Sequence, residues 1–77
     1  MYYVYILKKK SNCGLYYGYT NNLHRRLDEH NKNKEWDLVY YETFLAEEDA
    51  RKREIKLKDY GQARAHLKNR IQNSLSI

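Results

Sequence analysis

Residues 2–19 read YYVYILKKKSNCGLYYGY and decide the fold, because they predict two strands joined by a turn. The segment from Tyr2 to Leu7 is β-branched and aromatic, a composition typical of a strand. The polar segment from Lys8 to Gly14 predicts a turn, since it contains Asn12 and Gly14. Leu15 to Tyr19 predicts a second short strand, so the stretch as a whole favours a hairpin.

The rest of the chain is expected to add helices and one more strand. Asn21 or Asn22 is expected to cap a first helix that runs to about Asn31, and a polar loop is expected from Asn31 to Glu35. A third strand is expected at Trp36 to Phe44. A helix is expected to begin at Leu45 and to be broken by Gly61, and a last helix is expected from about Gln62 to Ser74. The order β-β-α-β-α-α predicts an α/β (α+β) fold, with a small three-stranded, mostly antiparallel sheet flanked by helices.

Length and charge narrow the classes of function. With 77 residues, the chain is expected to form a single domain over residues 1–77. Fifteen Lys and Arg against ten Asp and Glu give a net charge of +5, which favours nucleic acid first and an anionic membrane surface second. The lone cysteine, Cys13, excludes an internal disulfide and fits the cytoplasm. No apolar run approaches the roughly 20 residues that span a membrane.

Two residues of the first predicted helix have the chemistry of a phosphate site. Arg26 and His30 are four residues apart and share one helix face, beside the face of Leu23 and Leu27. Arginine offers a rigid fork of donors to a phosphate, and histidine can donate or accept a proton. The alternative is a solvated charged face, since Arg25, Asp28 and Glu29 surround the two side chains.

Glu54 interrupts the side of the second predicted helix that should face the core. It shares a stripe with Ala46, Ala50 and Leu57. A buried carboxylate needs a cation or several donors, and Mg²⁺ takes one or two carboxylates together with waters and phosphate oxygens. The alternative is a pair with a nearby Lys or Arg.

Gly18 lacks a Cβ, and this would let backbone or substrate come close. The alternative is that Gly18 serves only a turn.

These residues, in this order, resemble the GIY-YIG nuclease superfamily over roughly Tyr2 to Ile71. The match is closest to the small stand-alone bacterial members, which are similar to the N-terminal domain of the excinuclease C subunit. The motifs that carry the resemblance are Tyr3-Val4-Tyr5, Tyr16-Tyr17-Gly18, Arg26 eight residues after that glycine, His30, Tyr40-Tyr41-Glu42, and Ala50 with Glu54. The chain departs from the family where Tyr3 replaces a glycine. It also departs near the C-terminus, where Asn69 is the nearest counterpart of a family asparagine.

The resemblance implies metal-dependent hydrolysis of a phosphodiester by an activated water. Glu54 would hold one Mg²⁺ or Mn²⁺, and Arg26 would neutralise the charge that grows on the phosphate oxygens. Tyr5, with Tyr16 nearby, would orient and deprotonate the water. A tyrosine with the ordinary pKa near 10 is a poor base at neutral pH. The pKa of Tyr5 must therefore be lowered by cationic neighbours, or Tyr5 must act through a chain of hydrogen bonds in which His30 could take part.

The expected substrate is DNA, with RNA as an alternative, in repair, recombination or processing. The expected nucleic-acid contacts are Gly18, Lys8, Lys10, Arg25 and Lys32, with further phosphate contacts at Lys9 and Lys34. Trp36 is expected to pack against the sheet. We expect a monomer or a weak homodimer.

Two other functions remain open on the sequence. One is a catalytically silent nucleic-acid-binding module with the same fold, since a domain of this length has no appended element that reads DNA. The other is an interaction domain that recruits a partner protein. An exposed apolar patch would be its sign, and the sequence shows no surplus apolar stripe.

Overall fold

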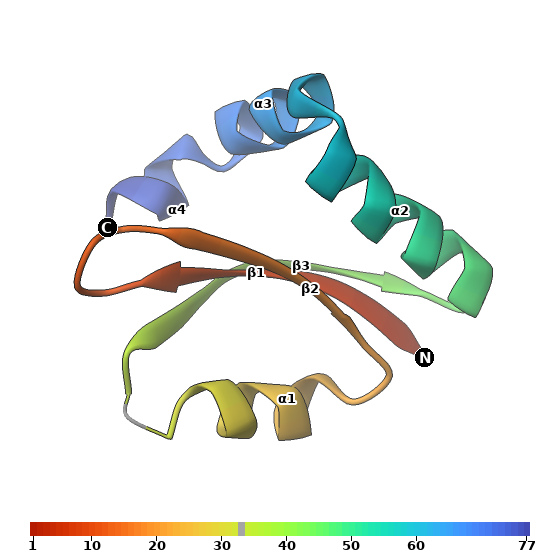
Figure 1. Ribbon diagram of the computed structural model, residues 1–77, viewed down its shortest axis with the longest axis horizontal. Helices are drawn as coiled ribbons and strands as arrows, with labels where there is room; N and C mark the ends of the chain where they lie inside the picture. The colour runs from red at the N-terminus through yellow and green to blue at the C-terminus, as the bar shows by residue number, and fades with distance from the viewer. Residues whose placement is uncertain (33) are drawn as a thin grey trace.

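A sheet lies between two layers of helices in the computed structural model, which describes residues 1–32 and 34–77 (Figure 1). The elements in chain order are β1 (Tyr2–Lys9), β2 (Leu15–Thr20), α1 (Leu23–His30), β3 (Trp36–Phe44), α2 (Glu47–Asp59), α3 (Gly61–Arg70) and α4 (Gln72–Ser76). Helix α1 covers one face of the sheet, and α2, α3 and α4 cover the other. The predicted α+β fold and its order of elements are confirmed, with the last predicted helix divided in two. The predicted loop from Asn31 to Glu35 includes residue 33, which lies outside the described residues.

Strand β1 is the middle strand of the sheet and pairs antiparallel with both neighbours, in the order β2-β1-β3. Tyr5 therefore has Gly18 of β2 on one side and Tyr41 of β3 on the other. Successive side chains of a strand point to opposite faces. Because both faces of the middle strand are covered, β1 is buried without interruption from Val4 to Lys8.

The hydrophobic core lies on the face covered by α2 and α3. It consists of Val4 and Ile6 from β1 together with Ala50, Leu57 and Leu67 from the two helices. Burial of a side chain such as leucine stabilises the folded state by about 1.5–3 kcal/mol. This face therefore carries the main apolar cluster, while Tyr5 and Leu7, which β1 points the other way, are buried to the same extent.

The break between α2 and α3 has a different cause from the one predicted. Tyr60 adopts an extended conformation, and Gly61 is the first residue of α3 rather than a glycine in the left-handed region. The guanidinium of Arg64 donates hydrogen bonds to the carbonyls of Leu57 and Lys58, at 3.0 and 2.5 Å. Arg64 thus satisfies the carbonyls that the end of a helix leaves unpaired. The prediction that Gly61 ends the helix is wrong in mechanism, although the position is within one residue.

Lys8 belongs to the helical face and not to a nucleic-acid surface. Its ammonium donates hydrogen bonds to the carbonyl oxygens of Leu75 and Ile77, at 2.5 and 3.0 Å. Lys8 is buried, and β1 points it towards the same side as Val4 and Ile6. The structure therefore does not bring Lys8 to the other predicted contacts, since this lysine joins the C-terminal helix to the sheet.

Candidate active site

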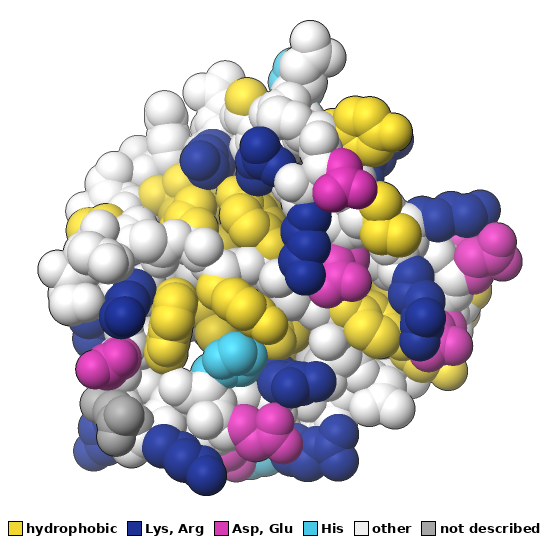
Figure 2. Space-filling view, in the orientation of Figure 1, with side chains coloured by type: hydrophobic (Ala, Val, Ile, Leu, Met, Phe, Trp, Pro, Cys, Tyr) yellow, Lys and Arg dark blue, Asp and Glu magenta, His cyan; other side chains and the backbone are white. Residues whose placement is uncertain are grey.

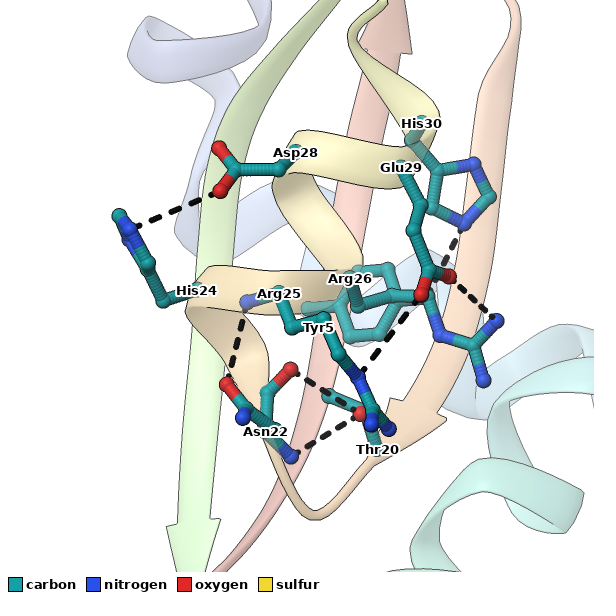
Figure 3. A network of polar contacts seen from close by, with 9 residues as sticks. All are labelled: Tyr5, Thr20, Asn22, His24, Arg25, Arg26, Asp28, Glu29 and His30. Carbon is teal, nitrogen blue, oxygen red and sulfur yellow. Dashed lines mark hydrogen bonds and ion pairs between the residues drawn. The ribbon is translucent and has the colours of Figure 1, made fainter.

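Arg26 and His30 lie on the side of α1 that faces the sheet. The partly buried residues of this helix are Leu23, Arg26, Leu27 and His30, and the others are exposed. Positions spaced by three, four and seven residues form one helix face. In Figure 3, His24 and Asp28 extend towards the other side of the helix. The pair therefore lies at the border between the sheet-facing side and the charged, solvated side, since the side chain of Arg26 is 41% exposed and pairs with Glu29.

The helix is held in this orientation by its N-terminal cap. The side chain of Asn22 accepts a hydrogen bond from the backbone N–H of Arg25 at 3.1 Å, and the backbone N–H of Asn22 donates to Thr20 Oγ1 at 3.0 Å. Thr20 is the last residue of β2. The cap thus fixes the direction in which α1 leaves the strand, and Asn22 is the capping residue of the two that the sequence offered.

Tyr5 occupies the space that Gly18 leaves free. Tyr5 is 1% exposed, and a Cβ built on Gly18 would lie 2.3 Å from Cζ and 2.4 Å from the hydroxyl oxygen of Tyr5. Gly18 lies inside β2 and not in a turn. Its missing side chain therefore admits the ring of Tyr5, and the expectation that Gly18 also contacts nucleic acid stays a prediction. The structure thus explains why a tyrosine and a glycine occur together in the two motifs.

Tyr5, Tyr16 and His30 form one aromatic group drawn from three elements. The Tyr5 hydroxyl lies 3.3 Å from Nε2 of His30, within hydrogen-bond distance. The ring of Tyr16 lies 4.8 Å from that of His30 and 6.2 Å from that of Tyr5, between ring centroids. Tyr16 is 39% exposed, so it is the tyrosine of this group that solvent and substrate can reach.

The pKa of Tyr5 is raised above its ordinary value and not lowered. Burial is the main cause, because it disfavours the charged phenolate, and the neighbouring Tyr16 acts in the same direction. The guanidinium of Arg26 acts in the opposite direction without outweighing these effects. The expectation that cationic neighbours lower this pKa is therefore wrong. The hydrogen bond to His30 matches the other expected possibility, a chain of hydrogen bonds.

Glu54 occupies the sheet-facing side of α2 next to fully buried residues. Ala50 and Leu57 are buried, and the side chain of Glu54 is 22% exposed. The carboxylate forms an ion pair with Lys58 one turn further along, at 3.2 Å. Besides burial, the charge of Glu54 contributes to the raised pKa of Tyr5, so the carboxylate lies within electrostatic reach of that hydroxyl. The pairing with a nearby lysine that the sequence left open is thus present in the structure.

The residues around Glu54 suit a cation that takes most of its ligands from elsewhere. Within residues 1–32 and 34–77, no group of three or more His, Cys, Asp and Glu could hold a metal ion. Mg²⁺ usually keeps several waters and binds through one or two carboxylates plus substrate phosphates, so a protein cage is not required. One partly exposed carboxylate within electrostatic reach of the Tyr5 hydroxyl fits this requirement.

The predicted basic contacts are spread around the site. Arg26 pairs with Glu29 at 3.5 Å, and Arg25 pairs with the same carboxylate at 3.7 Å on the more exposed side of the helix. Lys10 pairs with Asp37 at 3.7 Å, and Lys32 is exposed just beyond the end of α1. The surface in Figure 2 carries a histidine at the edge of a group of hydrophobic side chains, with basic and acidic side chains interspersed around it.

Trp36 is a neighbour of the site that the sequence did not predict. Its ring lies 6.2 Å from that of Tyr16 and 6.4 Å from that of His30, between centroids. Trp36 begins β3 and pairs with Lys9 of β1, which places it at the same end of the sheet as Tyr16. No local pattern could have revealed this, since the position of Trp36 depends on the register between two strands distant in sequence.

The sequence of the chain is similar to those of known proteins. The family model of the GIY-YIG catalytic domain matches residues 1–72. The chain is 38% identical over 68 residues to UPF0213 protein SH2523 of Staphylococcus haemolyticus, in an alignment that covers 77% of this chain and 82% of that protein. No solved structure matches the chain. None of the helices in the described part of the chain has the length and apolar character needed to cross a membrane.

Proposed function

Because the chain belongs to the GIY-YIG catalytic domain family, a family of nucleases, we propose that it is a metal-dependent endonuclease that hydrolyses phosphodiester bonds in DNA. The observation that carries the proposal is that Tyr5, Tyr16, Arg26 and His30 meet on one face of the sheet, with Glu54 in electrostatic reach. We further propose that it acts in DNA repair, recombination or processing in the cytoplasm, where the exposed thiol of Cys13 would stay unpaired.

Arg26 supports the proposal through its position and its charge. Its guanidinium is partly buried on the sheet-facing side of α1 and acts on the Tyr5 hydroxyl electrostatically. A guanidinium offers a planar fork of donors that matches a phosphate, and it stays charged at all relevant pH values. In the proposed reaction, Arg26 stabilises the negative charge that develops on the phosphate oxygens during hydrolysis. Its pair with Glu29, at 3.5 Å, would open when the phosphate binds.

Tyr5 and His30 would move the proton of the attacking water without forming a phenolate. The water proton would pass to the Tyr5 oxygen while the phenol proton passes to Nε2 of His30, which becomes an imidazolium. Imidazole accepts protons near neutral pH, whereas a buried phenol does not release one to solvent. Tyr16, the exposed tyrosine, would hold the water by a hydrogen bond at the entrance to this pair.

Glu54 would hold the divalent ion, Mg²⁺ or Mn²⁺. When bound, such an ion neutralises charge on a phosphate oxygen and on the leaving oxygen. The ammonium of Lys58, at 3.2 Å from the carboxylate, occupies the side on which a cation would bind, and it would have to turn away into solvent. The side chain of Lys58 is half exposed, so its ammonium can be solvated when it leaves the carboxylate.

The experiment that tests the proposal is a cleavage panel with one matched pair of variants. Supercoiled plasmid, single-stranded, duplex and branched DNA, and RNA are incubated with Mg²⁺, Mn²⁺ or EDTA. Glu54→Gln is expected to reduce cleavage by about a hundredfold or more. Glu48→Gln, on the exposed side of the same helix and also paired with a lysine, is expected to change it by less than about twofold. Cleavage that survives Glu54→Gln, or that proceeds in EDTA, would contradict the proposal.

A second candidate is a binding module that does not cleave. It is favoured by one observation, the ion pair of Glu54 with Lys58, which neutralises the proposed metal ligand. This candidate predicts metal-independent retention of DNA on a filter and no turnover of any substrate in the panel with either ion.

A further inference from the structure

An aromatic surface extends beyond the proposed catalytic residues. Tyr16, His30 and Trp36, here called the aromatic platform, contact one another pairwise, with centroids 4.8 to 6.4 Å apart. The ring of Trp36 meets those of Tyr16 and His30 at 65° and 70°, the edge-to-face arrangement that aromatic pairs prefer. The platform lies on the α1 face of the sheet, opposite the hydrophobic core, so packing of the core does not require it.

Trp36 is held in place by the backbone at both sides. Its backbone N–H donates a hydrogen bond to the side-chain oxygen of Asn31, the residue that caps the end of α1, at 3.3 Å. The residue before Trp36 is held as well, because the carbonyl of Glu35 accepts a hydrogen bond from the backbone N–H of Lys10 at 2.7 Å. Trp36 is therefore fixed to the C-terminal end of α1, which carries His30, and to the end of β1. The ring itself packs edge to face on those of Tyr16 and His30, and a ring that is preorganised can bind a flat ligand without first being ordered.

Positive charge accompanies the exposed side of the platform. The ammonium of Lys9 lies 5.8 Å from the centroid of Trp36, and Lys10 follows it in the chain. Lys10 is half exposed, and its partner Asp37 is exposed as well, so this ion pair is weak. Aromatic rings flanked by lysines are the combination by which proteins bind single-stranded nucleic acid, since bases stack on the rings and phosphates meet the ammonium groups.

We propose that the aromatic platform stacks an unpaired nucleobase next to the scissile phosphate, with Trp36 as a substrate-positioning residue and Lys9 on the adjoining phosphate. The inference rests on the proposed function, because it requires a nucleic-acid strand across the same site. In a duplex, the faces of the bases are covered by their neighbours, so the platform selects DNA with a single-stranded segment. The substrate class is therefore unpaired or flapped DNA rather than intact duplex.

The chain offers a direct probe of this contact, because Trp36 is its one tryptophan. The emission of Trp36 is recorded while the protein is titrated, in EDTA, with a short oligothymidylate or with a blunt duplex of equal nucleotide content. We expect the single strand to quench the emission in a saturable way and the duplex to do so only at concentrations at least about tenfold higher. Equal quenching by both, or none by the single strand, would overturn the proposal.

Three variants separate stacking from folding. Trp36→Leu is expected to weaken binding of a labelled oligothymidylate by about tenfold, and Trp36→Phe by less than about threefold, because the ring is retained. Tyr60→Leu is the matched control, since Tyr60 is a 61% exposed aromatic residue at the junction of α2 and α3. It is expected to bind like the original chain. Equal binding by Trp36→Leu, with its fold verified by circular dichroism, would refute the contact.

Failure of this inference and failure of the proposed function give different results. The binding measurements contain no metal, so they do not depend on cleavage. Quenching of Trp36 by single strands in a chain that cleaves nothing would remove the nuclease proposal and keep the platform. Cleavage of DNA without any change in the emission of Trp36 would keep the nuclease proposal and remove the platform.

Discussion

The two faces of the sheet carry different kinds of side chain, although the same middle strand supplies both. On the face of α2 and α3, β1 contributes Val4 and Ile6 to a closed apolar core. On the face of α1, it contributes Tyr5, which is just as buried but makes a hydrogen bond to His30 over Gly18. One face therefore holds the chain together, while the other holds polar groups in positions that a core would not require.

The same contrast occurs between neighbouring residues of α2. Arg53 forms hydrogen bonds of 2.9 to 3.2 Å with both carboxylate oxygens of Glu42, which also accepts one from Tyr40. Glu54 has the single ion pair with Lys58, a partner on its own helix. Arg53 is thus fixed by partners from the sheet, whereas the one ion-pair partner of Glu54 lies on its own helix. Under the proposed function, the first charge is structural and the second exchanges its lysine for a metal ion.

The largest expected effect is the loss of stability when the core face is weakened. Leu57→Ala removes a fully buried side chain and is expected to lower the free energy of unfolding by about 2–5 kcal/mol. Cleavage per folded molecule should remain near that of the original chain. Urea unfolding followed by circular dichroism, with the cleavage rate measured on the folded fraction, checks both statements. A loss of cleavage per folded molecule would contradict the view that this face serves stability and the other face serves the chemistry.

The next effect concerns the packing of Tyr5 on Gly18. Gly18→Ala would place a Cβ 2.3 Å from Cζ of Tyr5 and is expected to cost about 1–3 kcal/mol of stability, since a buried ring must move. In the background of Tyr5→Leu, most of that cost should vanish. A double-mutant cycle measures this coupling, and additive costs would contradict the packing argument. Gly61→Ala is the control, because its Cβ would meet no atom closer than 3.6 Å.

A smaller effect is expected at alkaline pH. Because the pKa of Tyr5 is raised in the folded state, the native chain retains a proton that the unfolded chain loses above about pH 10. This stabilisation is fully present below that pH and is lost as pH rises towards the folded pKa, by at most about 1.4 kcal/mol per pH unit. Tyr5→Phe should therefore reduce the fall in the free energy of unfolding, measured with urea, between pH 9 and about 11. The partly buried Tyr17 and Tyr40, whose pKa values are raised for the same main reason, contribute to the rest.

The smallest effect tests the freedom of Glu54. Lys58→Gln removes its partner and should lower the Mg²⁺ concentration that gives half-maximal cleavage by about two- to fivefold. Lys52→Gln breaks a pair of the same spacing and length with Glu48 and should leave that concentration unchanged. An equal response of the two variants would indicate a general effect of charge rather than release of the carboxylate.

The sequence predicted the strands well, because they follow from local periodicity. Arg26 and Glu54 could be singled out since each interrupts or borders an apolar stripe. Gly18, Lys8 and Trp36 could not be understood in this way. The partner of Gly18 lies across a strand pair, that of Lys8 lies at the far end of the chain, and the neighbours of Trp36 are set by sheet register. Such contacts between distant segments leave no local signal.

The proposed function requires that charged residues on the α1 face serve the chemistry and not the stability of the fold. The most direct test is to measure the DNA cleavage rate and the melting temperature of Arg26→Ala beside those of Arg25→Ala. These arginines are neighbours that share Glu29 as partner, but only Arg26 faces the sheet. We predict a loss of cleavage of about a hundredfold or more for Arg26→Ala and of less than about threefold for Arg25→Ala. The melting temperatures of both should stay within about 4 °C of the original. Similar rates for the two variants, or a loss of cleavage that follows a loss of stability, would contradict the claim.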